Sequence, residues 1–145
     1  MVQMVDSRQR KLNIMEIVTI ALENTKSQYP LQVALPAIIT EMSQPNTKVQ
    51  QFGNTIFVLH QGQHGGMFKA LNADTAPNFV QNSIQFLQMV KQLGLPTLVT
   101  DFQGEDIRRM IKLIAAKPPF PGMGMQIQHT NDGGYRATIN MGGAE

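Results

Sequence analysis

Apolar residues recur at helical spacing in the first third of the chain, before any alternating pattern begins. Between Asn13 and Lys26 they lie three or four residues apart, and Tyr29-Pro30 ends the pattern, so an amphipathic helix is predicted there. A second helix is predicted from Pro36, which suits a first helical turn, to about Met42. Two helices therefore precede the first clear strand.

The pattern then changes to the two-residue period of strands. Three runs rich in β-forming residues follow one another, separated by glycine-containing turns, at residues 48–52, 55–60 and 67–71. They predict a three-stranded antiparallel meander. After Asp74 and Thr75, either of which can cap a helix, the most regular apolar stripe of the chain runs through Pro77 to Gly94.

The last third alternates once more between strand and helix. A short apolar run at residues 97–102 predicts a central strand covered on both faces. A helix with acidic residues in its first turn is predicted from Glu105 to Lys117 and ends at Pro118-Pro119. Residues 125–130 and 135–141 alternate apolar and polar positions around an Asn-Asp-Gly-Gly turn, which predicts a terminal β-hairpin.

These elements predict an α+β fold, with a mixed, mainly antiparallel sheet of about six to seven strands and about four helices. The seventh strand would be a short one at residues 2–5. A chain of 145 residues suits a single domain over 1–145, with flexible ends expected at 1–10 and 142–145.

Composition excludes several classes of protein. The chain has no cysteine, so it holds neither a disulfide nor a thiolate metal site. His60 and His64 are four residues apart on a strand and its loop, a spacing that does not reliably bring the rings together, so no metal site is predicted. No apolar run is as long as a membrane span, and the first residues lack the order of a signal peptide. A cytoplasmic protein without a membrane partner is expected.

The charge is small and the polar surface is largely neutral. The net charge is +2, and the basic residues are not interleaved with aromatic ones as base stacking requires, so nucleic-acid binding is not predicted. Glutamine is frequent among the polar positions. Neutral polar groups cost less to desolvate than ions, so such a surface suits packing inside a protein assembly.

Over essentially the whole chain, the order helix, helix, three-strand meander, helix, strand, helix and hairpin resembles the core of the GNAT N-acetyltransferases. The resemblance implies an acetyl-CoA site on the strand before the central helix and on the turn after it, which maps onto Lys69, Ala70, Leu71, Asn72, Thr75 and Asn78.

Two features of that family are missing. The turn after residue 71 has no glycine and carries Asp74 and Pro77, whereas the family presents bare backbone N–H groups to a pyrophosphate there. The helix from Glu105 to Lys117 has no tyrosine to serve as general acid, and His60 and His64 are the nearby candidates for a base. No catalytic residue is therefore assigned, and the chain resembles a degenerate member of the family that is not an enzyme.

The chain is also similar to a group of small, degenerate acetyltransferase-like proteins encoded among the virion genes of tailed bacteriophages. The likeness lies in the loop 60–66, the helix start 78–82 and the segment 133–136. It implies a structural or assembly role in a phage particle, with other virion proteins as partners and the host cytoplasm as the place of synthesis.

Three further residues are candidates for a functional role. Asp101 follows the predicted central strand, where it could orient a substrate amine, although a turn residue is the simpler interpretation. The proline-rich segment after residue 117 exposes Phe120 and Met123 unless the domain covers them, and exposed apolar groups of this kind mark a docking site for a partner.

Two functions follow from the sequence. The first is a non-catalytic structural or interaction protein on an acetyltransferase-like scaffold, a tailed-phage virion component without a cofactor. The alternative is a divergent acetyl-CoA-dependent N-acetyltransferase. A gap between the strands near Ala70 and Leu98, able to admit pantetheine, would favour the alternative. A continuous hydrogen-bonded sheet there, or a side chain that fills the gap, would exclude it.

Overall fold

The computed structural model describes residues 11–24 and 30–142 of the chain. In chain order its helices and strands are α1 (Ile14–Asn24), α2 (Leu31–Met42), β1 (Thr47–Phe52), β2 (Thr55–Gln61), β3 (Gly66–Asn72), α3 (Ala76–Leu93), β4 (Thr97–Phe102), α4 (Glu105–Ala116), β5 (Gly124–His129) and β6 (Tyr135–Asn140). The expected strand at residues 2–5 lies outside the described residues.

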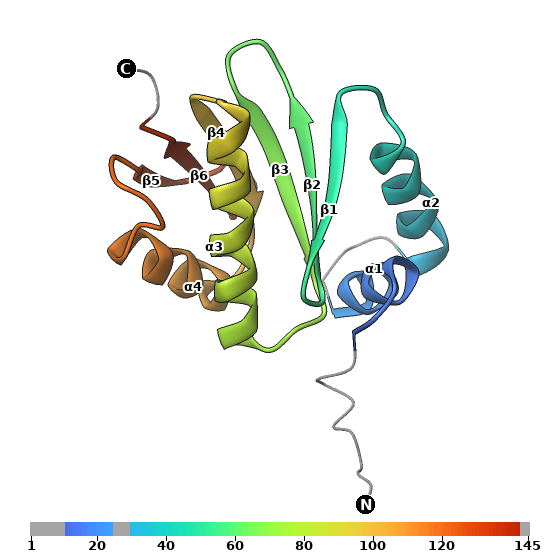
Figure 1. The fold of residues 1–145 in the computed structure, drawn as a ribbon. Coiled ribbons are helices and arrows are strands. Elements are labelled where there is room, and N and C mark those ends of the chain that lie inside the picture. Colours follow the sequence, from blue (N-terminus) through green and yellow to red (C-terminus); the bar gives the residue numbers. More distant parts are fainter. Residues whose placement is uncertain (1–10, 25–29, 143–145) are drawn as a thin grey trace, which may run out of the picture.

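The six strands form one sheet in the order β1-β2-β3-β4-β6-β5. All neighbouring pairs are antiparallel except β3 and β4, which are parallel and are joined by the crossover helix α3. Helices α3 and α4 cover one face of the sheet, and α1 and α2 cover the other face beside β1 to β3 (Figure 1). The predicted α+β class is therefore confirmed, with four helices and six strands among the described residues.

One helix begins earlier than the sequence indicated. The predicted start at Pro36 is wrong, because α2 begins at Leu31, after Pro30 as the N-cap, and Pro36 lies inside the helix. The proline ring points to solvent, while Leu35, Ile38 and Met42 pack against α1 and the sheet. The packing of this stripe compensates for the hydrogen bond that a proline cannot make.

The sheet separates two hydrophobic cores. The core under α3 and α4 contains Phe57, Phe86, Leu98 and Ile139, and the core under α1 and α2 contains Ile17, Val18, Ile56 and Val58. Strand β2 is fully buried from Thr55 to Leu59 and contributes alternate side chains to both cores. This strand is therefore the centre of the larger half of the sheet.

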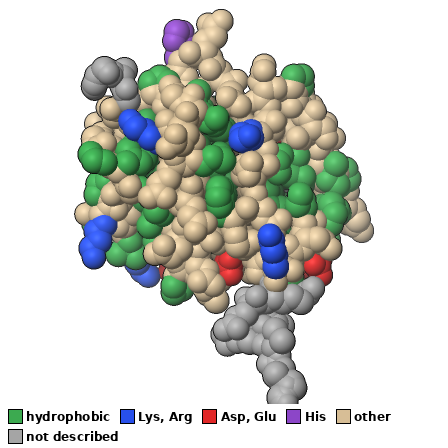
Figure 2. Space-filling view, viewed as in Figure 1, with side chains coloured by type: hydrophobic (Ala, Val, Ile, Leu, Met, Phe, Trp, Pro, Cys, Tyr) green, Lys and Arg blue, Asp and Glu red, His purple; other side chains and the backbone are tan. Residues whose placement is uncertain are grey.

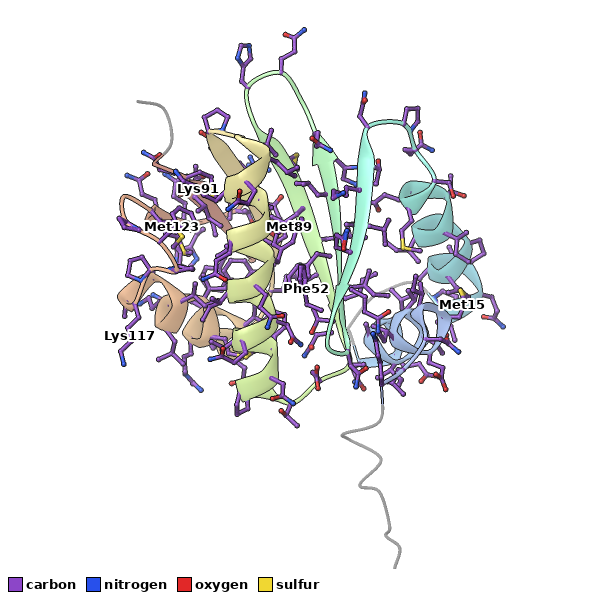
Figure 3. All side chains as sticks on the ribbon, in the orientation of Figure 1. Met15, Phe52, Met89, Lys91, Lys117 and Met123 are labelled. Carbon is purple, nitrogen blue, oxygen red and sulfur yellow. The ribbon has the colours of Figure 1, made fainter. Side chains whose placement is uncertain are left out.

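Stacked phenylalanines hold α3 against the meander. Phe86 of α3 stacks on Phe57 of β2 with ring centroids 4.3 Å apart, and it also meets Phe68 of β3 at 4.9 Å. Phe52 of β1 adds an edge contact to Phe57 at 6.2 Å (Figure 3). Aromatic pairs of this geometry add about 0.5–1.5 kcal/mol each beyond the burial of their area.

Replacing Phe86 with alanine is expected to lower the free energy of unfolding by about 3–5 kcal/mol, because it removes the stacked ring and leaves a cavity at the helix–sheet contact. Urea unfolding measures this change. Leu113→Ala on α4 is the matched control, since that side chain is 62% exposed and its loss should cost under about 0.5 kcal/mol. Similar losses in the two variants would contradict this account of the core.

Candidate functional site

Strands β3 and β4 are joined only where they begin. The pairing register between them contains Gly66 with Leu98 and Met67 with Val99 and nothing further. Strand β3 continues to residue 72 along β2, and β4 continues to residue 102 along β6, so the two halves of the sheet diverge. The facing backbone groups beyond Met67 and Val99 have no partner in the sheet.

A glycine allows the close contact at the joined end. Gly65 has φ +154°, and a Cβ atom at this position would stand 2.4 Å from the carbonyl oxygen of Thr97. A side chain there would force the strands apart at the point where they meet. The gap that the alternative function requires is thus open at Ala70, whereas at Leu98 the two strands are paired.

A cavity of ≈ 1010 Å³ opens between the diverging strands. Its walls come from both faces of the sheet, with apolar side chains under α3 and α4 and more polar groups near the ends of β3 and β4. The inner walls include Phe57, Phe68, Ala70, Phe86, Leu87, Ile111, Ile114, Ala137 and Ile139. A slot with apolar walls and bare strand edges suits an extended ligand that carries amide groups.

The residues that the resemblance assigned to a cofactor are partly brought together here. Four of them, on β3, line the cavity: Lys69, Ala70, Leu71 and Asn72. Thr75 and Asn78 lie just beyond it at the start of α3. Thr75 is the N-cap of this helix, and its side chain makes no capping hydrogen bond.

The turn between β3 and α3 is fixed by a network around Asp74. Its carboxylate accepts hydrogen bonds from the Asn54 backbone N–H at 2.8 Å, from Asn82 at 2.9 Å and from Asn78 at 3.3 Å. Asn72 accepts from the Asp74 N–H and donates back to its carbonyl. The β1–β2 turn, the β3–α3 turn and the side of α3 are therefore tied together through one carboxylate.

Three more carboxylates stand at the rim of the cavity, and each is paired with an arginine. Arg136 holds both oxygens of Asp101, at 2.7 and 3.0 Å, across the β4–β6 pair. The hydrogen bond from Arg136 lowers the pKa of Asp101. Glu105 pairs with Arg108 and Asp106 with Arg109. Because Asp101 is already bound by Arg136, its strand-end position does not leave it free to orient an amine.

A polar cluster that the sequence did not predict lies on the opposite face of β2 and β3. Glu41 of α2 accepts from His60 Nε2 at 2.7 Å and from Lys69 Nζ at 2.8 Å, and Thr47 lies 3.0 Å from His60 Nδ1. Lys69 also lines the cavity. The strand alternation could have placed His60 and Lys69 on one face, but only the packing of α2 brings Glu41 to them.

Burial raises the pKa of Glu41, but the hydrogen bonds from Lys69 and His60 and their charges outweigh it, so the pKa lies below its ordinary value of 4.5. This carboxylate is thus ionised at neutral pH, next to an ammonium group and an imidazole.

The wall made by α4 is apolar apart from Glu105 and Asp106 in the first turn of the helix, which are paired with arginines. The side chains it turns to the cavity include Ile107, Ile111 and Ile114. Tyr135 of β6 does reach α4, where its hydroxyl donates to Glu105, and that hydrogen bond raises the pKa of the tyrosine. The missing general acid that the sequence indicated therefore has no substitute on this wall.

The proline-rich segment packs back onto the domain. Met123 is only 8% exposed and belongs to the core under α3 and α4, and Phe120 packs against that core with Lys91 5.2 Å above its ring. Figure 3 shows Met123 and Lys91 on the same side of the molecule, between α3 and the terminal hairpin. Met123 is therefore buried and Phe120 half-buried, so the exposure expected of Met123 is wrong, whereas a docking role for this segment stays a prediction.

Other sites are not found in the described part of the chain. No group of three or more metal-ligating side chains gathers there, and none of its helices combines the length and apolar character needed to cross a membrane. On the face shown in Figure 2, lysine and arginine side chains are scattered singly over a mainly neutral surface.

Comparison with known proteins supports the fold. No protein-family model matches the chain, and no curated protein sequence matches it. Among solved structures, the ribosomal-protein-S18-alanine N-acetyltransferase from Escherichia coli is similar with a TM-score of 0.56 and 8% identity, over 94% of this chain and 94% of that one. At this identity the likeness shows the fold alone, and the chain has a GNAT-like fold.

Replacing Glu41 with glutamine is expected to flatten the pH dependence of stability below about pH 5, because a carboxyl group with a lowered pKa stabilises the folded state only while it is ionised. That stabilisation is complete above the ordinary value of 4.5 and is lost as the pH falls through the lower folded value. Urea unfolding at a series of pH values measures it. Glu23→Gln, on the exposed side of α1, is the control. An equal pH dependence of the free energy of unfolding in both variants would show that ionisation of Glu41 does not stabilise the fold.

Proposed function

We propose that the chain binds an acyl thioester of pantetheine in the gap between β3 and β4 and transfers the acyl group to an amine. The observation that carries the proposal is the divergence of two parallel strands after Met67 and Val99, with a cavity between them. The pantetheine arm is narrow and contains two amide groups. It would add to the bare edge of β3 as an extra strand does, with the inner phenylalanines around it.

The reaction would need little from the protein beyond positioning. The amine nitrogen forms a bond to the thioester carbonyl carbon, the bond from that carbon to sulfur breaks, and the products are an amide and a free thiol. The imidazole of His60 would receive the proton of the amine through water, since Lys69, which lines the cavity, is already an ammonium group and the pKa of Glu41 is lowered. Water would protonate the departing sulfur, because α4 carries no tyrosine and its two carboxylates at the cavity are paired with arginines.

A second candidate is the non-catalytic interaction protein that the sequence favoured. The isoleucine wall of α4 supports it, since many acetyltransferases of this type carry a tyrosine on that helix. A role in a tailed-phage particle rests on the sequence resemblance alone. For this candidate the gap would be a remnant of an ancestral site.

The test is to titrate the protein with acetyl-pantetheine and acetyl-CoA in a calorimeter, and then to follow thiol release with a set of amines. The chain has no cysteine, so a thiol-reactive dye reports only the released product. Micromolar binding of either donor, about −8 kcal/mol, together with amine-dependent thiol release would support the transferase. No heat from either donor at millimolar concentration would overturn it and leave the interaction protein.

Replacing Ala70 with leucine is expected to weaken binding of the donor at least tenfold, about 1.4 kcal/mol, because Ala70 lines the slot and the added carbons would occupy part of it. The same calorimetric titration measures the loss. Ala37→Leu on the exposed side of α2 introduces the same side chain away from the cavity and should bind like the wild type. Unchanged affinity in the Ala70 variant would place the ligand elsewhere, and thermal unfolding of both variants separates occlusion from misfolding.

A further inference from the structure

The end of the slot where β3 meets α3 does not suit acetyl-CoA, the ligand that the fold suggests. Acetyl-CoA carries a nucleotide diphosphate, which needs free N–H groups or cations where β3 meets α3. We infer that this site takes a pantetheine thioester without the nucleotide diphosphate. The inference rests on the proposed function and names its donor more narrowly.

The first observation is the carboxylate of Asp74 at the turn. It lines the cavity one residue before the N-cap of α3, beside the first turns of that helix. Its hydrogen-bond donors are a backbone N–H and the amides of Asn78 and Asn82, all of them neutral. Among the described residues it has no cationic partner, so its charge faces the cavity uncompensated and repels a phosphate.

The second observation is how few backbone donors remain at this turn. The N–H of Ala73 donates to the Asn54 carbonyl at 2.9 Å, and the N–H of Asp74 donates to the Asn72 side chain at 3.0 Å. Pro77 has no N–H to offer. The turn itself therefore offers few bare N–H groups. In the first turn of α3, the N–H groups of Ala76 and Asn78 have no acceptor among the described residues, but Pro77 between them interrupts the row that would cradle a diphosphate.

The third observation is the shortage of cations in the cavity wall. Lys69 is the one basic residue among the described residues that line the cavity. The carboxylates of Asp101, Glu105 and Asp106 at its rim are paired with arginines, whereas that of Asp74 has no cationic partner among the described residues. The ammonium group of Lys69 is held by Glu41 at 2.8 Å. A ligand with several phosphate charges would thus enter a site without a counter-charge, whereas uncharged acetyl-pantetheine would not meet this barrier.

The turn cannot easily rearrange to admit phosphate. Gly53 has φ +57°, and a Cβ atom there would lie 2.9 Å from the Asp74 carboxylate and 2.7 Å from Asn82, so the β1–β2 turn packs directly on the network. Asn82 also donates to Thr55 at 3.0 Å, and both side chains are buried. Moving Asp74 aside would leave the Asn82 amide and the Asn54 backbone N–H without the acceptor that they now share.

The test compares donors on the unmodified protein. Calorimetric titration should show acetyl-pantetheine binding at least tenfold more tightly than acetyl-CoA, and ADP at millimolar concentration should not compete with either. Added salt should strengthen acetyl-CoA binding by screening the repulsion and leave acetyl-pantetheine binding unchanged. Tighter binding of acetyl-CoA, or competition by ADP, would overturn this inference and leave the proposed function intact. Failure of both donors to bind would overturn the two together.

Asp74→Asn gives a second, independent measurement. Removing the charge while keeping the size of the side chain should raise the affinity for acetyl-CoA several-fold and leave that for acetyl-pantetheine nearly unchanged. Glu23→Gln changes the net charge by the same amount on the exposed side of α1 and should alter neither. Equal effects of the two substitutions would show that only net charge matters and would contradict the role of Asp74. The donor comparison on the wild type decides the question if the Asp74 variant does not fold.

Discussion

The structure depends on a parallel pair of strands that is closed at one end and open at the other. Strand β3 keeps its full pairing with β2, and β4 keeps its full pairing with β6, so each follows the twist of its own half of the sheet. Only the glycine-containing start of β3 lies close enough to β4 to pair with it. The cavity, the bare strand edges and the site of the proposed donor all result from this divergence.

The two sides of the cavity have different chemistry because two different layers cover the sheet. On the side of α3 and α4 the wall is apolar, and its phenylalanine stack also anchors α3. On the side of α1 and α2, Glu41 gathers His60 and Lys69 into an ionised cluster. The proposed acyl donor would therefore have an apolar wall on one side and a charged, hydrogen-bonded cluster on the other.

In the turn before α3, one carboxylate has a structural role. A helix start in this position commonly offers its N–H groups to an anion. Here Asp74 supplies a negative charge from within the chain and collects hydrogen bonds from Asn54, Asn78 and Asn82. The turn is thus well ordered without any phosphate, and its rigidity holds the end of β3 and the start of α3 in place.

The sequence by itself determined the order and type of the elements, because the hydrophobic periods, the turn at Gly53-Asn54 and the cap at Gly94 are local signals. It also determined which groups are missing, namely the glycine turn and the tyrosine of the helix after residue 104. Only the tertiary structure decided that Met123 is covered, that α2 extends back through Pro36, and that Glu41 reaches His60. The divergence of β3 from β4 was likewise decided there, since it arises from competition between neighbouring strands far apart in the chain, which no local pattern records.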